Sequence, residues 1–338
     1  MTLRVLGEEP RRSRMFAEDL GLRTAFPRLA YYASMWSYYE AATNTTPRDL
    51  SLVEVDGNGL PAFGFLGGSD TSGVSFFGTP AIAEFADLGP GMRQDRLGRE
   101  VAEEIIRDLN RVRASTLTVR VLSRSSVLAG FDHVLLSAGA KTQLQFSAEV
   151  DLTLPEERIW SSLRSRYRSL INRGRKTFEV DIVSAERPEK SVFDSYRALH
   201  REVAGKQTRS DESWDEMYRR LVHDEALLLV ARLEDRPVAA TFVTKFGGLA
   251  VYASGAYVRD LGNFPVSHWP MYASMLAAKQ AGCSRFIIGA GYFDASVETP
   301  EKLQSIANFK RGFATEILMH RQYVLESSTS GDGGEKNG

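Results

Sequence analysis

The chain has 338 residues, of which 43% are apolar and 25% are charged, close to the averages for globular proteins. This length suits two ordinary domains, each able to bury a core. The formal net charge of −1 excludes a strong overall field that would draw the protein to nucleic acid or anionic lipid, so such a contact needs a local patch. The single cysteine, Cys283, excludes a disulfide within the chain and argues against a cysteine-based zinc site.

No sequence signal indicates export or membrane insertion. Residues 1–10 lack an apolar core of signal-peptide length, and no stretch reaches the roughly 18 apolar residues needed to span a bilayer. A cytoplasmic protein without an integral membrane segment is therefore expected. The tail at 326–338 is rich in Ser, Gly and charge and is expected to be disordered.

The first half is predicted to begin with helices and to continue as strands. Residues 15–42 are expected to be mostly helical with an interruption near Pro27, and their many aromatic residues are interpreted as a core stripe. A helix is predicted over 96–113 from the spacing of its apolar residues. Strands are predicted at 50–55, 61–66, 74–77, 117–122 and 144–150, with a turn at 56–59.

The second half repeats this order of hairpin, strand, helix and strand. Strands are predicted at 227–233, 238–245, 249–254, 286–288 and 314–325, with a helix at 266–280. Two copies of one order of elements indicate a duplicated α+β unit. Between the copies, helices are predicted at 155–176, 188–204 and 214–223.

Four segments of the chain, in order, resemble the Fem family, whose members join activated aminoacyl groups to amines. They are a basic helix at 159–176, a strand and aromatic-ended hairpin at 229–256, a helix and strand at 267–288, and Ile306–Phe313, which is similar to the family's Phe-Lys-x-x-Phe stretch. The resemblance covers residues 154–323 well and the first third only by element order.

The resemblance implies an α+β fold of two tandem GNAT-like (acyl-CoA N-acyltransferase-like) domains, each a mixed, mainly antiparallel sheet flanked by helices. The first domain is expected at 1–150 and the second at 151–313. In the Fem family the last strand returns to the N-terminal domain, so residues 314–325 are a candidate to complete the first domain.

The resemblance also implies a transferase of the acyltransferase class, which forms an amide bond when an amine attacks an activated acyl carbonyl. The expected donor is aminoacyl-tRNA, and no cofactor is needed. The expected acceptor is an amine-bearing small molecule or a cell-wall precursor. Such a reaction requires that the reactants be held together, that a hydrogen-bond donor meet the developing oxyanion and that the amine proton have an acceptor.

Lys310 is the first candidate catalytic residue. It lies among Ile306, Phe309 and Phe313, and a lysine in an apolar frame is costly to bury unless it is paired. The resemblance implies that Lys310 acts near the reacting carbonyl; the alternative is a surface lysine whose stem alone is covered. Its neighbour Arg311 is a weaker candidate for substrate binding.

The basic helix is the candidate binding element for a phosphate-bearing partner. Six cations occur between Ile159 and Lys176 and no carboxylate interrupts them, which fits a diphosphate or an RNA backbone. Helical spacing places Arg164 and Arg168 on one face, with Arg175 near the same line. A solvated helix face is the alternative interpretation.

Three further groups are predicted to line the cleft. Small residues after the strand at 286–288 would let a ligand approach the backbone, so Tyr292 and Asp294 are candidates to orient the amine or accept its proton. Tyr252 is expected to line the acceptor cleft. Lys206, in the polar loop after 204, is a candidate for substrate binding.

Two other functions stay open. The first is an acyl-CoA-dependent N-acyltransferase of polysaccharide or small-molecule biosynthesis. Against it, Phe264 stands where the pyrophosphate-binding loop of acyl-CoA acetyltransferases has a small residue, and Pro265 follows. The second is a non-catalytic binding protein on a GNAT scaffold. The five histidines show no metal-ligand spacing, so no metal site is expected.

Overall fold

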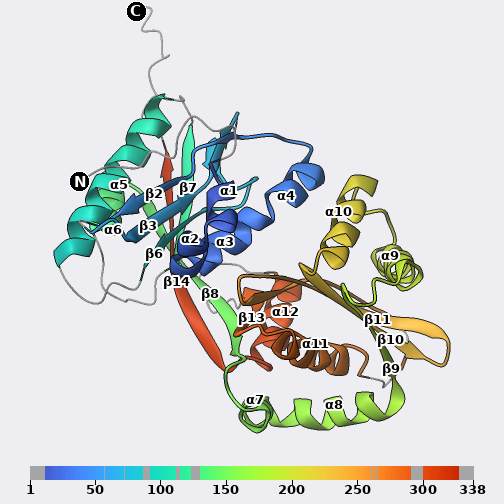
Figure 1. Cartoon of the computed structure of the whole chain (residues 1–338). Helices are drawn as coiled ribbons and strands as arrows, with labels where there is room; N and C mark the ends of the chain where they lie inside the picture. The colour runs from blue at the N-terminus through green and yellow to red at the C-terminus, as the bar shows by residue number, and fades with distance from the viewer. Residues whose placement is uncertain are drawn as a thin grey trace, which may run out of the picture. The chain divides into compact units, whose positions relative to one another are not determined.

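The computed structural model describes residues 12–56, 58–71, 73–86, 92–111, 115–122, 130–259, 261–262, 265–290 and 300–326. The chain divides into two compact units (Figure 1). Unit 1 comprises Met1–Gln145 and Met319–Gly338, and unit 2 comprises Phe146–Leu318. The chain passes between the units within β8 (Lys141–Asp151) and again within β14 (Glu316–Glu326).

Unit 1 contains helices before, within and after a run of short strands. The helices are α1 (Arg14–Glu18), α2 (Leu20–Ala25), α3 (Pro27–Ser34), α4 (Trp36–Thr43), α5 (Met92–Arg111) and α6 (Gly130–Ser137). The strands are β1 (Arg48–Asp49), β2 (Leu52–Val55), β3 (Pro61–Leu66), β4 (Gly68–Asp70), β5 (Gly73–Ser75), β6 (Ala81–Phe85) and β7 (Thr116–Leu122).

The central path of the unit 1 sheet is β2-β3-β6-β7-β14. Neighbours along it are antiparallel except β6 and β7, which are parallel. Alternate residues of each strand enter cores on opposite faces. Phe65 and Ala83 pack with α5 and α6, whereas Leu66 and Ile82 pack with α1 to α4.

Unit 2 has the same succession of hairpin, strand, helix and strand. Its strands are β9 (Glu179–Val183), β10 (Ala226–Leu233), β11 (Arg236–Phe246), β12 (Leu249–Tyr257) and β13 (Arg285–Ala290). Its helices are α7 (Glu156–Ser162), α8 (Ser165–Thr177), α9 (Lys190–Ala204), α10 (Asp211–Val222), α11 (His268–Gln280) and α12 (Glu301–Arg311).

The unit 2 sheet has the order β8-β13-β12-β11-β10-β9, with one parallel pair between β12 and β13. Helix α11 packs on one face, where Leu229, Val243 and Phe286 join its core. Helices α9 and α10 pack on β10, β11 and β12, and Tyr196 of α9 stacks on Phe242 with ring centroids 6.0 Å apart. The sheet therefore places strand residues between two helical layers.

The predicted element order is largely confirmed, but two of the predicted elements differ in the structure. The helix predicted over 155–176 is two helices, because Leu163 is buried and the Arg164 amide donates to the Gly312 carbonyl at 2.9 Å, outside the helical ladder. The strand predicted at 74–77 ends at Ser75, because Phe77 and Gly78 form a tight turn with φ of 51° and 76°. Strands β5 and β6 both pair parallel with β7.

Candidate active site

The feature that defines the candidate site is a separation of two parallel strands in unit 2. Strands β12 and β13 pair only from Leu249 with Arg285 to Val251 with Ile287. Beyond that point β12 continues beside β11 to Tyr257, while β13 continues beside β8 to Ala290. Backbone groups of both strands beyond the last pair are thus available to a ligand between them.

Irregularities in both strands accompany this separation. The register shifts between Phe242 and Val243 on the β11 side and between Ile287 and Gly289 on the β13 side. A bulge bends its strand and redirects the side chains beyond it. The strands therefore diverge because each is bulged next to the last shared pair.

Lys310 lies against the bulged end of β13. Gly289 has a φ of 112°, and a Cβ added there would lie 2.9 Å from the Lys310 Nζ. Only glycine both adopts this backbone conformation readily and leaves room for the amine. The amine also lies 6.0 Å from the ring centroid of Tyr252, within cation–π range.

The Lys310 amine is half-buried. Burial lowers the pKa of the Lys310 ammonium below its usual value. Within the described part of the chain, no carboxylate forms an ion pair with it. Among the described residues, Lys310 is therefore held at the strand separation without a fixed anionic partner.

A tyrosine pair borders the same opening. The hydroxyls of Tyr252 and Tyr257 lie 3.4 Å apart, and the Tyr257 hydroxyl lies 3.1 Å from Thr241 Oγ1. Burial raises the pKa of Tyr252 well above its usual value, and the neighbouring Tyr257 and Tyr196 phenols raise it further. Burial also raises the pKa of Tyr257. These phenols are therefore protonated near neutral pH and can act as hydrogen-bond donors.

An aromatic contact fixes α12 against α8. The Tyr167 ring packs on Phe313 with centroids 4.9 Å apart, and the Tyr167 hydroxyl donates to the Phe309 carbonyl at 3.3 Å. Gly312 makes this contact possible, because an added Cβ would lie 2.1 Å from the Tyr167 ring. The start of α8 thus meets the end of α12, next to Lys310.

His268 joins the same aromatic contact. Its ring lies 4.6 Å from the Tyr167 ring, centroid to centroid. Burial, and then the nearby Arg166 guanidinium, lower the pKa of His268 to about 4. The imidazole is therefore neutral near pH 7 and adds no charge to this corner.

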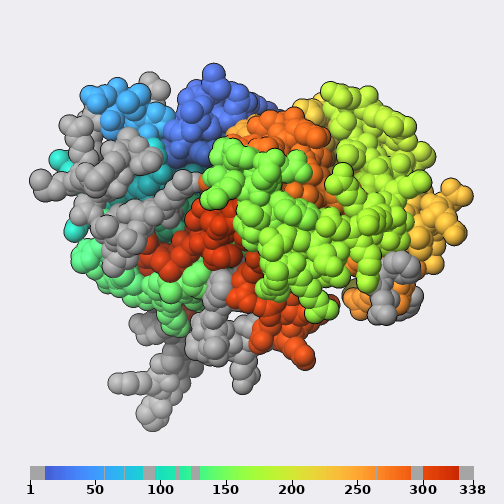
Figure 2. Space-filling model, turned by 90° about the horizontal axis from the view of Figure 1, so that it is seen from below, coloured from blue at the N-terminus to red at the C-terminus, as the bar shows by residue number. Residues whose placement is uncertain are grey.

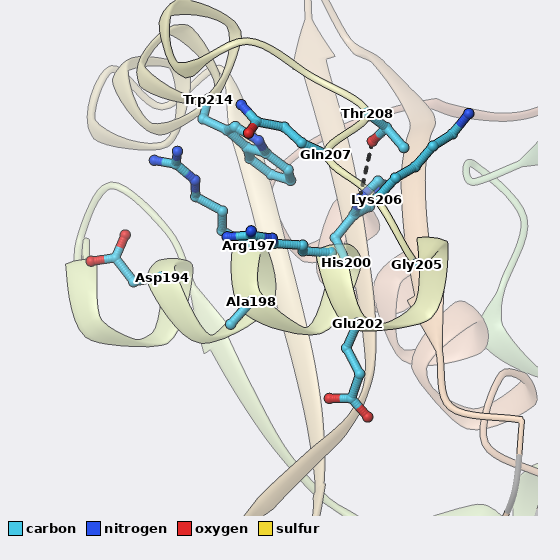
Figure 3. A pocket seen from close by; sticks show the side chains of 11 residues that line it. Asp194, Arg197, Ala198, His200, Glu202, Gly205, Lys206, Gln207, Thr208 and Trp214 are labelled. Atoms are coloured by element: carbon cyan, nitrogen blue, oxygen red, sulfur yellow. Dashed lines mark hydrogen bonds between the residues drawn. The ribbon is translucent and has the colours of Figure 1, made fainter.

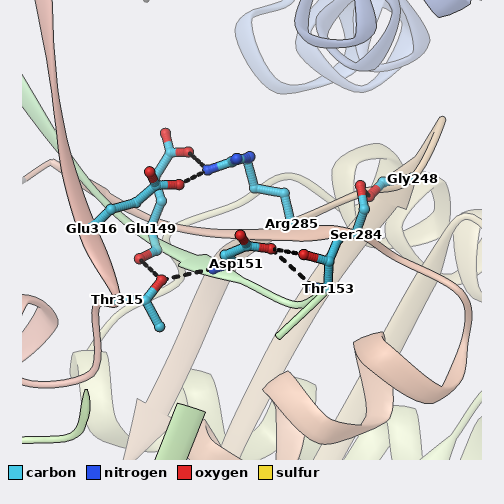
Figure 4. A network of polar contacts seen from close by, with 8 residues as sticks. All are labelled: Glu149, Asp151, Thr153, Gly248, Ser284, Arg285, Thr315 and Glu316. Atoms are coloured by element: carbon cyan, nitrogen blue, oxygen red, sulfur yellow. Dashed lines mark hydrogen bonds and ion pairs between the residues drawn. The ribbon is translucent and has the colours of Figure 1, made fainter. Parts of the chain in front are cut away.

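A polar network fixes the other end of the segment that follows α12 (Figure 4). Arg285 of β13 pairs with Glu149 of β8 at 3.2 Å and with Glu316. Thr315 donates its amide to the Glu149 carbonyl at 2.9 Å, and its Oγ1 accepts the Asp151 amide at 2.8 Å. The chain that leaves α12 is therefore bonded to β8 and β13 soon after the helix ends.

The basic residues of α8 form a continuous surface, here called the α8 ridge. It contains Arg164, Arg166, Arg168, Arg173, Arg175 and Lys176, all exposed except Arg168, which is half-buried and donates to the Ser161 carbonyl at 3.4 Å. None of Arg164, Arg166, Arg175 and Lys176 pairs with a described carboxylate. Figure 2 shows this green surface beside red-orange atoms of the C-terminal segment.

The structure corrects the predicted geometry of this ridge. Arg164 has a non-helical φ of −49° and ψ of 131° and precedes α8, so it does not share a helical face with Arg168. Instead its backbone bonds to Gly312 next to α12. Arg311 is half-buried, and its guanidinium donates to Asn308 on the same helix.

A second concave surface lies on the α9 side of the sheet and is here called the α9–α10 hollow (Figure 3). Its volume is about 820 Å³. It is lined by α9, by the loop from Gly205 to Thr208 and by Trp214 of α10. Lys206 lies here, on a different element from Lys310.

Arg209 connects this hollow to β12. Its guanidinium lies over the Trp214 ring and donates to His200 Nε2 at 2.7 Å and to Ser254 Oγ at 3.0 Å. Because a guanidinium only donates, His200 Nε2 accepts and Nδ1 carries the proton facing Thr208 Oγ1 at 3.4 Å. Burial, and then Arg209, lower the pKa of His200, which keeps the imidazole neutral.

The described site residues that the sequence predicted thus lie in four places. Lys310 and Tyr252 meet at the strand separation, and Arg164 and Arg311 lie at the junction of α8 and α12. Arg168 and Arg175 continue along α8, whereas Lys206 lies in the α9–α10 hollow. Tyr292 and Asp294 lie outside the described residues, as does Phe264.

Several site residues were not predicted. They come from separate elements, and the fold brings them together at the β12 bulge and at the loop between α9 and α10. They are Tyr257, Thr241, His200, Arg209 and Trp214. The aromatic-ended hairpin and the small residues ending β13 were the available sequence signals for this region. In the described part of the chain, no cluster of His, Cys, Asp or Glu could hold a metal ion, and no helix is both long and apolar enough to cross a bilayer.

Comparisons with known proteins agree with this architecture. Residues 161–299 match the family model described as an acetyltransferase (GNAT) domain. No curated protein sequence is significantly similar to the chain. The crystal structure of FemX superposes with a TM-score of 0.60 at 12% identity, covering 88% of this chain and 92% of FemX.

Two further solved structures share the fold at low identity. The C-terminal domain of a lysylphosphatidylglycerol synthetase from Agrobacterium fabrum has a TM-score of 0.53 at 11% identity, covering 89% of this chain and 88% of its own. The structure of L-PGS from Bacillus licheniformis has a TM-score of 0.52 at 10% identity, covering 88% and 86%. The expected Fem-like GNAT fold, mixed sheets flanked by helices, is confirmed.

Proposed function

We propose that this chain, an acyltransferase with a GNAT domain and a FemX-like fold, transfers an aminoacyl group from aminoacyl-tRNA to an amine, forming an amide bond. The observation that carries this proposal is the contact between the α8 ridge and α12. Most of its cations pair with no carboxylate among the described residues, and such a cationic surface suits a chain of phosphates. It ends beside the helix that carries Lys310, so an acyl ester at the end of such a chain would reach the strand separation.

The chemistry assigned to the site follows from its donors. The acceptor amine attacks the ester carbonyl, a C–N bond forms, and the ribose oxygen of the tRNA leaves after taking up a proton. The Lys310 ammonium donates to the developing oxyanion, where a fixed donor in a partly dry site is worth about 10²–10³ in rate. The Tyr252 ring holds the ammonium from one side.

The names of the structural neighbours support aminoacyl transfer. Lysylphosphatidylglycerol synthetase denotes an enzyme that makes an aminoacylated lipid. The sequence at 259–264 departs from the CoA-binding pattern, which supports tRNA over coenzyme A as the donor. The acceptor is proposed to be an amine-bearing small molecule or a cell-wall precursor.

Binding of the donor tests this proposal. Aminoacyl-tRNA is expected to bind with an affinity that falls with salt, and Arg164→Ala/Arg166→Ala should reduce the slope of log K against log[salt] by roughly one to two. The matched control, Arg201→Ala/Lys206→Ala, removes the same charge elsewhere and should keep the slope. Saturable binding of acetyl-coenzyme A without binding of aminoacyl-tRNA would contradict the proposal.

A further inference from the structure

The α9–α10 hollow carries a charge imbalance. Its two lining carboxylates are neutralised by cations outside it: Asp194 pairs with Lys190, and Glu202 pairs with Arg236 at 2.9 Å. In Figure 3 the Glu202 carboxylate points away from the other labelled side chains.

The cations of the hollow are less fully neutralised. Arg197 pairs with Asp211 at 2.5 Å. Arg201 and Lys206 form no ion pair with any residue that the structure describes. Both side chains are exposed, so their charge is available to a ligand in the hollow. The hollow therefore carries an excess of positive charge, which favours binding of an anion.

The loop that presents Lys206 is fixed at both ends. Gly205 closes α9 in the left-handed conformation with φ of 68°, and its amide donates to the Arg201 carbonyl at 3.0 Å. Ser210 caps α10 by accepting the Ser213 amide at 3.2 Å. Gln207 Nε2 donates to the Arg209 carbonyl at 3.0 Å. A preorganised loop loses little conformational entropy on binding.

A chain of contacts connects the hollow to β12, the strand that carries Tyr252. Its wall residues Trp214 and His200 contact Arg209, which bonds to Ser254 of β12 at 3.0 Å. Ser254 follows Tyr252 closely along β12, and Tyr252 lies beside Lys310. A volume of about 820 Å³ falls within the range of small-molecule sites.

From these observations we infer that the α9–α10 hollow binds the anionic part, a carboxylate or a phosphate, of the molecule whose amine is acylated. This inference rests on the proposed function, because it takes the hollow to serve the same reaction. Arg201 and Lys206 bind the anion, and Arg209 is a positioning residue that holds His200 and Trp214 against β12. The amine of the ligand extends toward Tyr252 and Lys310.

The test uses two probes, sodium pyrophosphate for a phosphate and glutarate for a carboxylate, titrated by calorimetry. The starting protein is Arg164→Ala/Arg166→Ala, so that the α8 ridge contributes less to anion binding. Adding Arg201→Ala/Lys206→Ala should lower the affinity for the probe that binds at least tenfold. A matched control, Lys141→Ala/Arg187→Ala in the same background, removes two cations outside the hollow and should leave the affinity unchanged.

The outcomes separate the two proposals. Binding of pyrophosphate alone indicates a phosphate-bearing acceptor, and binding of glutarate alone indicates a carboxylate-bearing one. Binding of neither probe, or equal loss in the control, overturns the inference about the hollow. Binding of aminoacyl-tRNA to the wild-type protein is measured separately, so its absence would overturn the proposed donor without affecting the result for the hollow.

Discussion

At the residue scale, the site depends on one cation beside one glycine. Lys310 has room for its amine because Gly289 carries no Cβ, and the left-handed φ of Gly289 belongs to the bulge that separates β13 from β12. The sequence indicated Lys310 through its apolar neighbours, yet Ile306 is 40% exposed, so that frame is only partly buried. The relation to Gly289 arises from a bulge that depends on pairing with β8, which a local sequence pattern does not encode.

Replacement of Lys310 should remove catalysis without unfolding the protein. Lys310→Met keeps the length of the stem and its packing but removes the oxyanion donor. The turnover rate is expected to fall about 10²–10³-fold, with little change in the substrate KM. A thermal midpoint equal to that of the wild type controls for folding. A variant with wild-type turnover would exclude Lys310 from the reaction.

The pH dependence of the rate should report the same group. Burial lowers the pKa of Lys310, so the ammonium loses its proton at a lower pH than an exposed lysine does. Once it is deprotonated, the oxyanion no longer has this hydrogen-bond donor. The rate is therefore expected to fall on the alkaline side, below the usual titration range of lysine. Lys310→Arg should shift this fall to higher pH in any residual activity. An unchanged alkaline profile in Lys310→Arg would contradict this assignment.

At the element scale, the junction of α8 and α12 fixes the α8 ridge next to the helix that carries Lys310. The sequence predicted one basic helix from 155 to 176, because the residues around Leu163 have no strong helix breaker. The break comes from a distant partner, the Gly312 carbonyl that accepts the Arg164 amide. The sequence indicated α12 only through the resemblance of 306–313 to the Fem family, although the helix extends over Glu301–Arg311.

Overpacking at this junction should destabilise the protein. In Gly312→Ala the new methyl would lie 2.1 Å from the Tyr167 ring, which has little room to move between His268 and Phe313. A loss of about 1–3 kcal/mol in the free energy of unfolding is expected by urea denaturation.

A double variant provides the control. Tyr167→Ala removes the ring that the methyl would strike, so Gly312→Ala/Tyr167→Ala should cost less than the two single losses added together. Strictly additive losses of stability would show that the contact between Gly312 and Tyr167 does not determine the stability of the junction.

At the scale of the whole molecule, the two units should respond oppositely to pH. In unit 1, burial raises the pKa of both Glu54 and Glu84 to about 7; a nearby Glu100 adds to the shift of Glu54, while the Leu29 amide opposes that of Glu84. A raised carboxyl pKa gives stability that is present below 4.5 and is lost as the pH rises through about 7.

Unit 2 should show the reverse. The pKa of His268 is lowered from 6.5 to about 4, so stability is lost as the pH falls through this window. Hydrogen exchange followed by mass spectrometry on peptides of each unit should show unit 1 more protected at pH 5.5 than at 7.5, and unit 2 less protected. Glu54→Gln/Glu84→Gln should remove the dependence in unit 1, and equal responses of both units would contradict these assignments.

The overall architecture was largely accessible from the sequence, since hairpins, amphipathic helices and their repeated order are local patterns. Strand β6, helix α6 and strand β9 were missed because each is short and its boundaries depend on neighbouring elements. The separation of β12 from β13 is a property of the assembled sheet, so the sequence indicated its residues, such as Tyr252, without showing what they adjoin.

The most direct test of the central claim is transfer of label from a charged donor. Aminoacyl-tRNA pools carrying a radiolabelled amino acid are incubated with the enzyme and a heat-treated extract of small metabolites, beside labelled acetyl-coenzyme A. The account predicts amide-linked label in the metabolite fraction from aminoacyl-tRNA, with wild type far more active than Lys310→Met. Label transferred from acetyl-coenzyme A alone, or equal transfer by Lys310→Met, would contradict it.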